Sequence, residues 1–116
     1  MFNTDSENIE NLSKEFVAEI QNIFSDKLKK VILYGSYARG DFDDESDIDV
    51  MVLADMPDME IREKRSDVVN LICEIDDKYN VFMAPVIIDV NHFNDWLPIL
   101  PFYINVNEEG VLWYGT

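Results

Sequence analysis

Hydrophobic residues along the chain follow two spacings, one typical of amphipathic helices and one typical of buried strands. Apolar residues recur every three or four positions over residues 6–26 and again over 57–78, which predicts two helices that each have one apolar face. Thr4 and Glu7 match a capping box at the start of the first helix. Short runs rich in Val, Ile and Leu lie between turn residues and predict strands at 31–34, 48–53, 81–88 and 111–114.

The C-terminal third continues this alternation with shorter elements. Residues 92–97 predict a short helical turn, and residues 101–109 predict a helix that ends at Gly110 and turns Phe102 inward. The same third is rich in aromatic and aliphatic side chains. Two explanations stay open for them: a second packed layer under the sheet, or an exposed surface for a partner.

Strands that alternate with helices predict an α/β (α+β) fold, with a mixed sheet of about four strands and helices mainly on one side. A length of 116 residues fits a single domain spanning 1–116. Pro85 removes a backbone donor from the strand 81–88 and therefore favours either an edge position for that strand or a bulge within it. Cys73 is the single cysteine, so no internal disulfide can form, and its apolar neighbours predict a small buried side chain.

Two aspartates open the second predicted strand. Side chains alternate between the faces of a strand, so Asp47 and Asp49 project from one face about 7 Å apart, while Ile48 and Val50 point into the core. Carboxylates at this separation raise each other's pKa unless a positive charge lies between them. Carboxylate oxygens suit Mg²⁺, which shares its coordination sphere with water and substrate phosphates. The pair therefore predicts a magnesium site.

A glycine turn follows the first predicted strand and can bind the phosphates of the same substrate. Gly35 lets the backbone approach an anion closely, Ser36 adds a hydroxyl, and a helical turn that begins here would present N–H groups. Arg39 is either a phosphate contact or a salt-bridge partner for one of the many acids. Together with Asp47 and Asp49, these residues could hold a triphosphate and its metal.

The segment 35–49, GSYARGDFDDESDID, resembles the signature of the DNA polymerase beta nucleotidyltransferase superfamily, and most closely its minimal nucleotidyltransferase (MNT) branch. That branch is known chiefly as the antitoxin of HEPN/MNT toxin-antitoxin pairs. The resemblance implies a polymerase beta-type fold, two Mg²⁺ ions held by Asp47 and Asp49, and a triphosphate held at Gly35 and Ser36. It also implies transfer of AMP from ATP to a tyrosine of a HEPN ribonuclease toxin within a hetero-oligomer.

One feature of this sequence departs from the superfamily pattern. The family's third metal-binding carboxylate belongs on the strand after the second helix, where residues 82–86 contain no acid. Asp89 is the nearest candidate for a third catalytic and metal-binding residue, and the alternative is that it caps the segment beginning at Asn91. The missing acid keeps two other functions open: a non-catalytic antitoxin that masks its toxin, and a nucleotidyltransferase acting on a small molecule.

Charge and composition narrow the range of partners. The chain has nine Lys and Arg residues and 24 Asp and Glu residues, which gives a formal net charge of −15. This negative charge disfavours binding to long nucleic acid. An acidic protein of this kind fits a basic partner protein, although the excess charge also explains solubility alone. No apolar run approaches the roughly 20 residues of a membrane span and no signal pattern opens the chain, so we expect a cytoplasmic location. The single histidine, His92, excludes a zinc site built from several His or Cys ligands.

Overall fold

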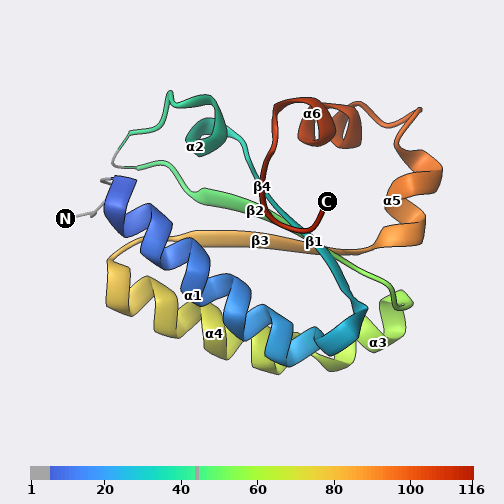
Figure 1. Cartoon of the computed structure of the whole chain (residues 1–116), viewed down its shortest axis with the longest axis horizontal. Helices are drawn as coiled ribbons and strands as arrows, with labels where there is room; N and C mark the ends of the chain where they lie inside the picture. The colour runs from blue at the N-terminus through green and yellow to red at the C-terminus, as the bar shows by residue number, and fades with distance from the viewer. Residues whose placement is uncertain (1–5, 44) are drawn as a thin grey trace.

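Four strands form one mixed sheet in the computed structural model, which describes residues 6–43 and 45–116 (Figure 1). Thr4 of the predicted capping box lies outside the described residues. The elements, in chain order, are α1 (Ser6–Phe24), η1, a 3-10 turn (Ser25–Lys27), β1 (Leu28–Tyr34), α2 (Ser36–Arg39), β2 (Ile48–Ala54), α3 (Asp58–Glu63), α4 (Arg65–Tyr79), β3 (Met83–Asp89), α5 (Val90–Trp96), α6 (Pro101–Glu109) and β4 (Val111–Tyr114).

The strand order is β3-β2-β1-β4, and the pairing directions decide which strand ends meet. β1 is antiparallel to both β2 and β4, whereas β2 and β3 are parallel. The end of β1 therefore lies beside the start of β2, and the start of β3 lies on the other side of β2 at the same end of the sheet. Every polar residue of the predicted site, except Asp89, belongs to this end of the sheet.

The predicted edge position of the strand that contains Pro85 is confirmed. The N–H of Ile48 donates to the carbonyl of Phe82 at 2.8 Å, and the β2–β3 register then directs the even-numbered residues of β3 toward β2. Pro85 consequently faces away from β2, where its missing N–H removes no bond of the ladder.

One face of the sheet packs against α1 and α4, which lie side by side below the strands in Figure 1. The alternate β2 residues Ile48, Val50 and Val52 are fully buried on this face, together with the apolar stripe of α1. Phe16 of that stripe meets the ring of Trp113 edge-on, with the ring centroids 6.2 Å apart. The helical spacing read from residues 6–26 thus marks the face of α1 that forms the main core.

The opposite face carries a second, smaller core under α5 and α6. Met51 and Leu53, which alternate with the residues of the main core, pack there against Phe93, Tyr103 and Val106. The four-stranded mixed sheet is confirmed, and the second packed layer accounts for part of the apolar C-terminal third. The longest helices lie on one side, as predicted, but the other side is partly covered too.

Several local predictions were wrong in detail. The first strand begins at Leu28, three residues earlier than predicted, and the second helix is two helices that separate at Lys64. Cys73 is exposed on α4 instead of buried, and Phe102 is 45% exposed instead of facing inward. No helix in the described part of the chain has both the length and the apolar character needed to cross a membrane.

The second core makes a direct prediction for stability. Phe93 is buried on α5, and its ring lies 4.9 Å from that of Tyr103 on α6. Phe93→Ala should lower the free energy of unfolding by about 3–5 kcal/mol, because it removes a buried ring and leaves a cavity. Urea denaturation of the variant measures this loss, and Asn94→Ala, at an exposed neighbour, is the control. Equal stabilities of the two variants would show that α5 and α6 are not packed on the sheet.

Candidate functional site

The site is centred where β1 ends and β2 begins. The antiparallel register places Tyr34, the last residue of β1, opposite Asp49. Paired residues of antiparallel strands project their side chains to the same face, which here is the face covered by α5 and α6. The turn at Gly35 therefore begins directly beside the Asp49 carboxylate.

Only glycine fits at position 35. Its φ of +74° and ψ of −153° lie in a region that residues with a Cβ rarely adopt. A Cβ added at Gly35 would also overlap Asp49 Oδ2. The glycine turn and the carboxylate are thus in contact, as a site for a phosphate chain and its metal requires.

After Gly35 the chain forms the single helical turn α2. The N–H groups of Ala38 and Arg39 both donate to the carbonyl of Gly35 at 3.1 Å, so Ser36 is the first residue of the turn. Tyr37 is buried and stacks on Phe42 with ring centroids 4.2 Å apart. This stacking fixes α2 and the following loop against the main core.

The carboxyl group of Asp49 has a shifted pKa. Burial raises its pKa above the ordinary 3.8, the nearby negative charge of Asp47 raises it further, and the positive charge of Arg39 lowers it. Burial likewise raises the pKa of Tyr34, and the charge of Asp49 adds to that shift. The charge of Asp47 thus acts on Asp49, and a positive charge placed near Asp49 would be favourable.

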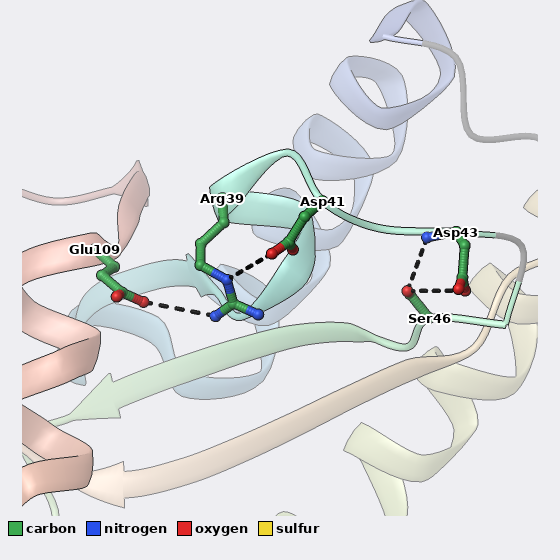
Figure 2. Close-up of polar contacts among 5 residues, drawn as sticks. All are labelled: Arg39, Asp41, Asp43, Ser46 and Glu109. Carbon is green, nitrogen blue, oxygen red and sulfur yellow. Dashed lines mark hydrogen bonds and ion pairs between the residues drawn. The ribbon is translucent and has the colours of Figure 1, made fainter.

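Arg39 on α2 pairs with two carboxylates, that of Asp41 in the following loop and that of Glu109 on α6 (Figure 2). Its Nε donates to Asp41 Oδ2 at 3.2 Å, and its Nη1 lies 3.6 Å from Glu109 Oε2. Of the two roles open to Arg39, the salt-bridge role is therefore present in this structure. A phosphate would have to compete with both acids for the guanidinium.

The loop that leads to Asp47 is closed by its own polar groups (Figure 2). The N–H of Asp43 donates to Ser46 Oγ at 2.9 Å, and Ser46 Oγ donates to Asp43 Oδ1 at 3.2 Å. The N–H of Glu45 donates to the same carboxylate oxygen at 2.9 Å. Asp43 thus serves the shape of the loop, and Asp47 follows at its end as an exposed side chain.

A cavity of about 230 Å³ opens beside the glycine turn, between β1 and α6. Its lining residues are Tyr34, Gly35, Arg39, Phe102, Asn105, Val106 and Glu109. A larger groove of about 710 Å³ lies between β3 and the helices α3 and α4, but it contains none of the predicted site residues. Chemistry, rather than cavity size, therefore locates the candidate site at Gly35 and Asp49.

The assignment of Asp89 as a third ligand is wrong. The parallel register pairs Asp89 with Ala54 at the far end of the sheet, whereas Ala84 is the residue of β3 that lies beside Asp49. Asp89 Oδ1 instead accepts a hydrogen bond from the N–H of Asn91 at 3.0 Å, which makes it the cap of α5. The capping alternative is thus the one that the structure contains.

Two carboxylates remain, and they fit magnesium. Mg²⁺ is commonly held by one or two carboxylates and completes its octahedron with water and substrate phosphates. Asp47 and Asp49 could supply such oxygens next to the turn at Gly35, which is predicted to hold phosphates. Within the described residues no cluster of three or more His, Cys, Asp or Glu could hold a metal, so a phosphate or water would supply the other ligands.

Several neighbours of the site escaped the sequence analysis. Tyr34, Phe102 and Glu109 line the cavity, yet the last two lie more than 50 residues from Asp49 in the sequence and give no local signal. Asp76 on α4 is raised in pKa by burial and, more weakly, by the charge of Asp47, while its hydrogen bond from the Met83 N–H lowers it. That 2.9 Å bond ties Asp76 to the start of β3.

Substitution of Gly35 tests the contact between the turn and the carboxylate. Gly35→Ala should cost about 1–3 kcal/mol of backbone strain and displace Asp49 as well. Gly40→Ala is the matched control, because Gly40 also has a positive φ, of +83°, but its added Cβ would meet nothing within 4 Å. We expect a strain cost of about 1–2 kcal/mol for the control. Denaturation midpoints measure both, and an equal loss in both variants would contradict the contact.

The raised pKa of Asp49 predicts a pH-dependent gain in stability for Asp49→Asn. A raised pKa in the folded state means that the stability contributed by Asp49 is complete below pH 3.8 and is lost as the pH rises through the folded pKa. The variant should therefore melt at a higher temperature than the wild type at pH 7, and the difference should shrink as the pH approaches 4. Glu74→Gln, at an exposed position of α4, controls for the change in net charge. A wild type that is the more stable of the two at pH 7 would contradict the assignment.

Known proteins resemble this chain along most of its length. Two proteins of Methanocaldococcus jannaschii, MJ0604 and MJ0141, each bear the name "Putative protein adenylyltransferase". MJ0604 is 36% identical over 110 residues, which cover 92% of this chain and 99% of the relative. MJ0141 is 43% identical over 75 residues, which cover 64% of this chain and 73% of the relative.

Solved structures share the fold at low sequence identity. A mutant of the toxin-antitoxin MntA-HpeT, with two Asp-to-Glu changes two positions apart, matches with a TM-score of 0.57 and 18% identity over 90% of this chain and 73% of that one. A toxin-antitoxin with AMP-PNP matches with a TM-score of 0.56 and 19% identity, at the same coverage. The family described as Polymerase beta, Nucleotidyltransferase matches residues 18–112. The chain therefore belongs to the polymerase beta-like nucleotidyltransferase family.

Proposed function

We propose that this chain is an antitoxin that neutralises a HEPN ribonuclease toxin by transferring AMP from ATP to a tyrosine of that toxin. The observation that carries the proposal is the contact between the Gly35 turn and the Asp49 carboxylate, with the charge of Asp47 close by. This arrangement provides a place for phosphates and a place for their metal within one side-chain length. The names of the relatives, protein adenylyltransferases, support the nature of the transferred group and of the acceptor.

In this proposal, each residue has a separate task. Gly35 and Ser36 hold the β- and γ-phosphates, because the turn approaches without side-chain hindrance. Asp47 and Asp49 would hold magnesium, which would supply positive charge for the oxygens that attack and leave the α-phosphorus. Arg39 adds a positive charge at the same turn once a phosphate displaces one of its two acids.

The reaction would be a single displacement at phosphorus. The tyrosine oxygen forms a bond to the α-phosphorus as the bond from that phosphorus to the bridging oxygen breaks, and pyrophosphate leaves. The hydroxyl proton passes to solvent, because Ala84 occupies the position of β3 that lies beside Asp49. In this proposal the acceptor comes from another protein, and the cavity of about 230 Å³ beside Gly35 has room for its side chain.

A second candidate function follows from the same alanine. Without an acid at Ala84, the site could bind nucleotide yet transfer it poorly, and the chain would then neutralise the toxin by contact alone. The toxin-antitoxin complexes with which it shares its fold are compatible with either mode. Transfer of label distinguishes the two.

The test uses ATP labelled at the α-phosphate, Mg²⁺ and the protein product of the adjacent gene. Label should appear on that protein with α-labelled ATP but not with γ-labelled ATP, and a chelator should prevent it. Asp49→Asn should lower the rate of label transfer by more than about 100-fold. Loss of a residue that only supports a metal ligand typically costs about 10- to 100-fold, so a larger loss would indicate a direct ligand. Asp89→Asn should retain transfer, because Asp89 only caps α5.

The other outcomes are equally informative. A tight complex that inhibits the toxin without acquiring label would overturn the transfer and support masking. Label that also appears with Asp49→Asn would show that the reaction does not use this site. The absence of both complex and label would refute both functions.

A further inference from the structure

Large hydrophobic side chains are exposed at the junction of α5 and α6. Trp96 is 44% exposed, Ile99 is 65% exposed and Phe102 is 45% exposed, all within seven consecutive residues. We call these three residues the α5–α6 patch. Seven of the nine large hydrophobic residues that are exposed in the described part of the chain lie after Lys78, so this C-terminal region is unusually apolar on its surface. Trp and Phe are enriched at protein interfaces and depleted elsewhere on surfaces.

The charge around the patch is predominantly negative, and Arg39, which reaches its edge, is paired there with Glu109. All nine Lys and Arg residues of the chain lie at or before Lys78, so residues 79–116 contain none. Exposed acids flank the patch on its own helices: Asp95 on α5, and Glu108 and Glu109 on α6. Aromatic rings among carboxylates attract cations through both the ring face and the negative charge. The surface therefore complements a partner whose contacting side chains are Lys and Arg.

The patch adjoins the candidate site. The Phe102 ring packs edge-on against that of Tyr34, with centroids 5.5 Å apart, and Phe102 lines the cavity that contains Gly35 and Arg39. Ile99 and Trp96 lie at the turn that precedes α6, where the N–H of Ile99 donates to the carbonyl of Trp96 at 3.0 Å. A protein that covers it would lie at the mouth of the cavity, on the same face of the sheet as Asp49.

We propose that the α5–α6 patch is the surface on which the acceptor protein docks, and that this acceptor presents a basic surface. The identity of the occupant as the acceptor rests on the proposed function. Its chemistry rests on the exposed aromatic residues and on the absence of Lys and Arg after Lys78. A second copy of this chain is disfavoured, because two predominantly acidic surfaces, on chains of net charge −15, would repel each other.

Replacing one apolar residue of the α5–α6 patch with a charged residue tests whether the patch is the docking surface. Ile99→Lys removes an exposed apolar side chain and adds a positive charge where a basic partner would bind. Val69→Lys is the matched control, because Val69 is 47% exposed on α4, on the opposite face of the sheet. Both variants have the same net charge. Neither residue lines the cavity at Gly35 or contacts Asp47 or Asp49.

Four quantities are measured for both variants: the affinity for the product of the adjacent gene, the affinity of the free chain for Mg-ATP, and the KM and kcat of label transfer. Ile99→Lys should weaken partner binding at least about tenfold and raise the KM for the partner, with kcat and ATP affinity unchanged. Val69→Lys should leave all of them near the wild-type values. Wild-type affinity should also fall with added salt, since opposite charges meet at the interface.

Each remaining outcome decides between the proposals. Equal partner affinities of the two variants, or no binding of this partner by the wild type, would overturn the docking surface. Self-association of the free chain that Ile99→Lys abolishes would overturn it too, in favour of a second copy. If the wild type binds the partner through Ile99 but transfers no label, the docking surface stands and the transfer reaction fails.

Discussion

The structure depends on one close approach, that of the Asp49 carboxylate to the backbone of Gly35. It arises because β1 and β2 are antiparallel and Tyr34 is paired with Asp49, so that the residue after Tyr34 has no room for a Cβ. The flanking residues Ile48 and Val50 are fully buried on the other face and hold the strand in this register. A one-residue slip would turn both aspartates into the main core. The hydrophobic alternation of β2 therefore specifies the position of the acids as well as the packing.

The sequence predicted the helices and strands better than it predicted the contacts between them. Helices and strands follow from local spacing, and the turn at Gly35 with its two aspartates stands out as a motif of 15 residues. The pairing of Arg39 with Glu109 could not be predicted, because it joins residues 70 positions apart through the packing of α6 on β1. Phe102 is also distant in sequence from the site residues. Its position at the cavity beside Gly35 could therefore not be predicted, and it was expected inside the core.

The position of Asp89 shows that closeness in sequence does not place a side chain at a given end of a sheet. Asp89 was the acid nearest to the expected position, but a strand of seven residues carries its last residue far from its first. Because β3 is parallel to β2, only its first residues reach the end of the sheet that holds Asp49. Strand direction, which the hydrophobic pattern does not encode, decided between the two roles open to Asp89.

The charges of the site suggest how nucleotide and metal would depend on each other under the proposed function. A triphosphate that approaches a chain of net charge −15 meets repulsion from the whole surface and from Asp47 and Asp49 in particular. The positive charge of Arg39 is already shared between Asp41 and Glu109. Magnesium would remove both difficulties, because it would neutralise the phosphate together with a carboxylate whose pKa is raised first by burial and then by the charge of Asp47. Binding should therefore favour the complex of nucleotide and metal over either component alone.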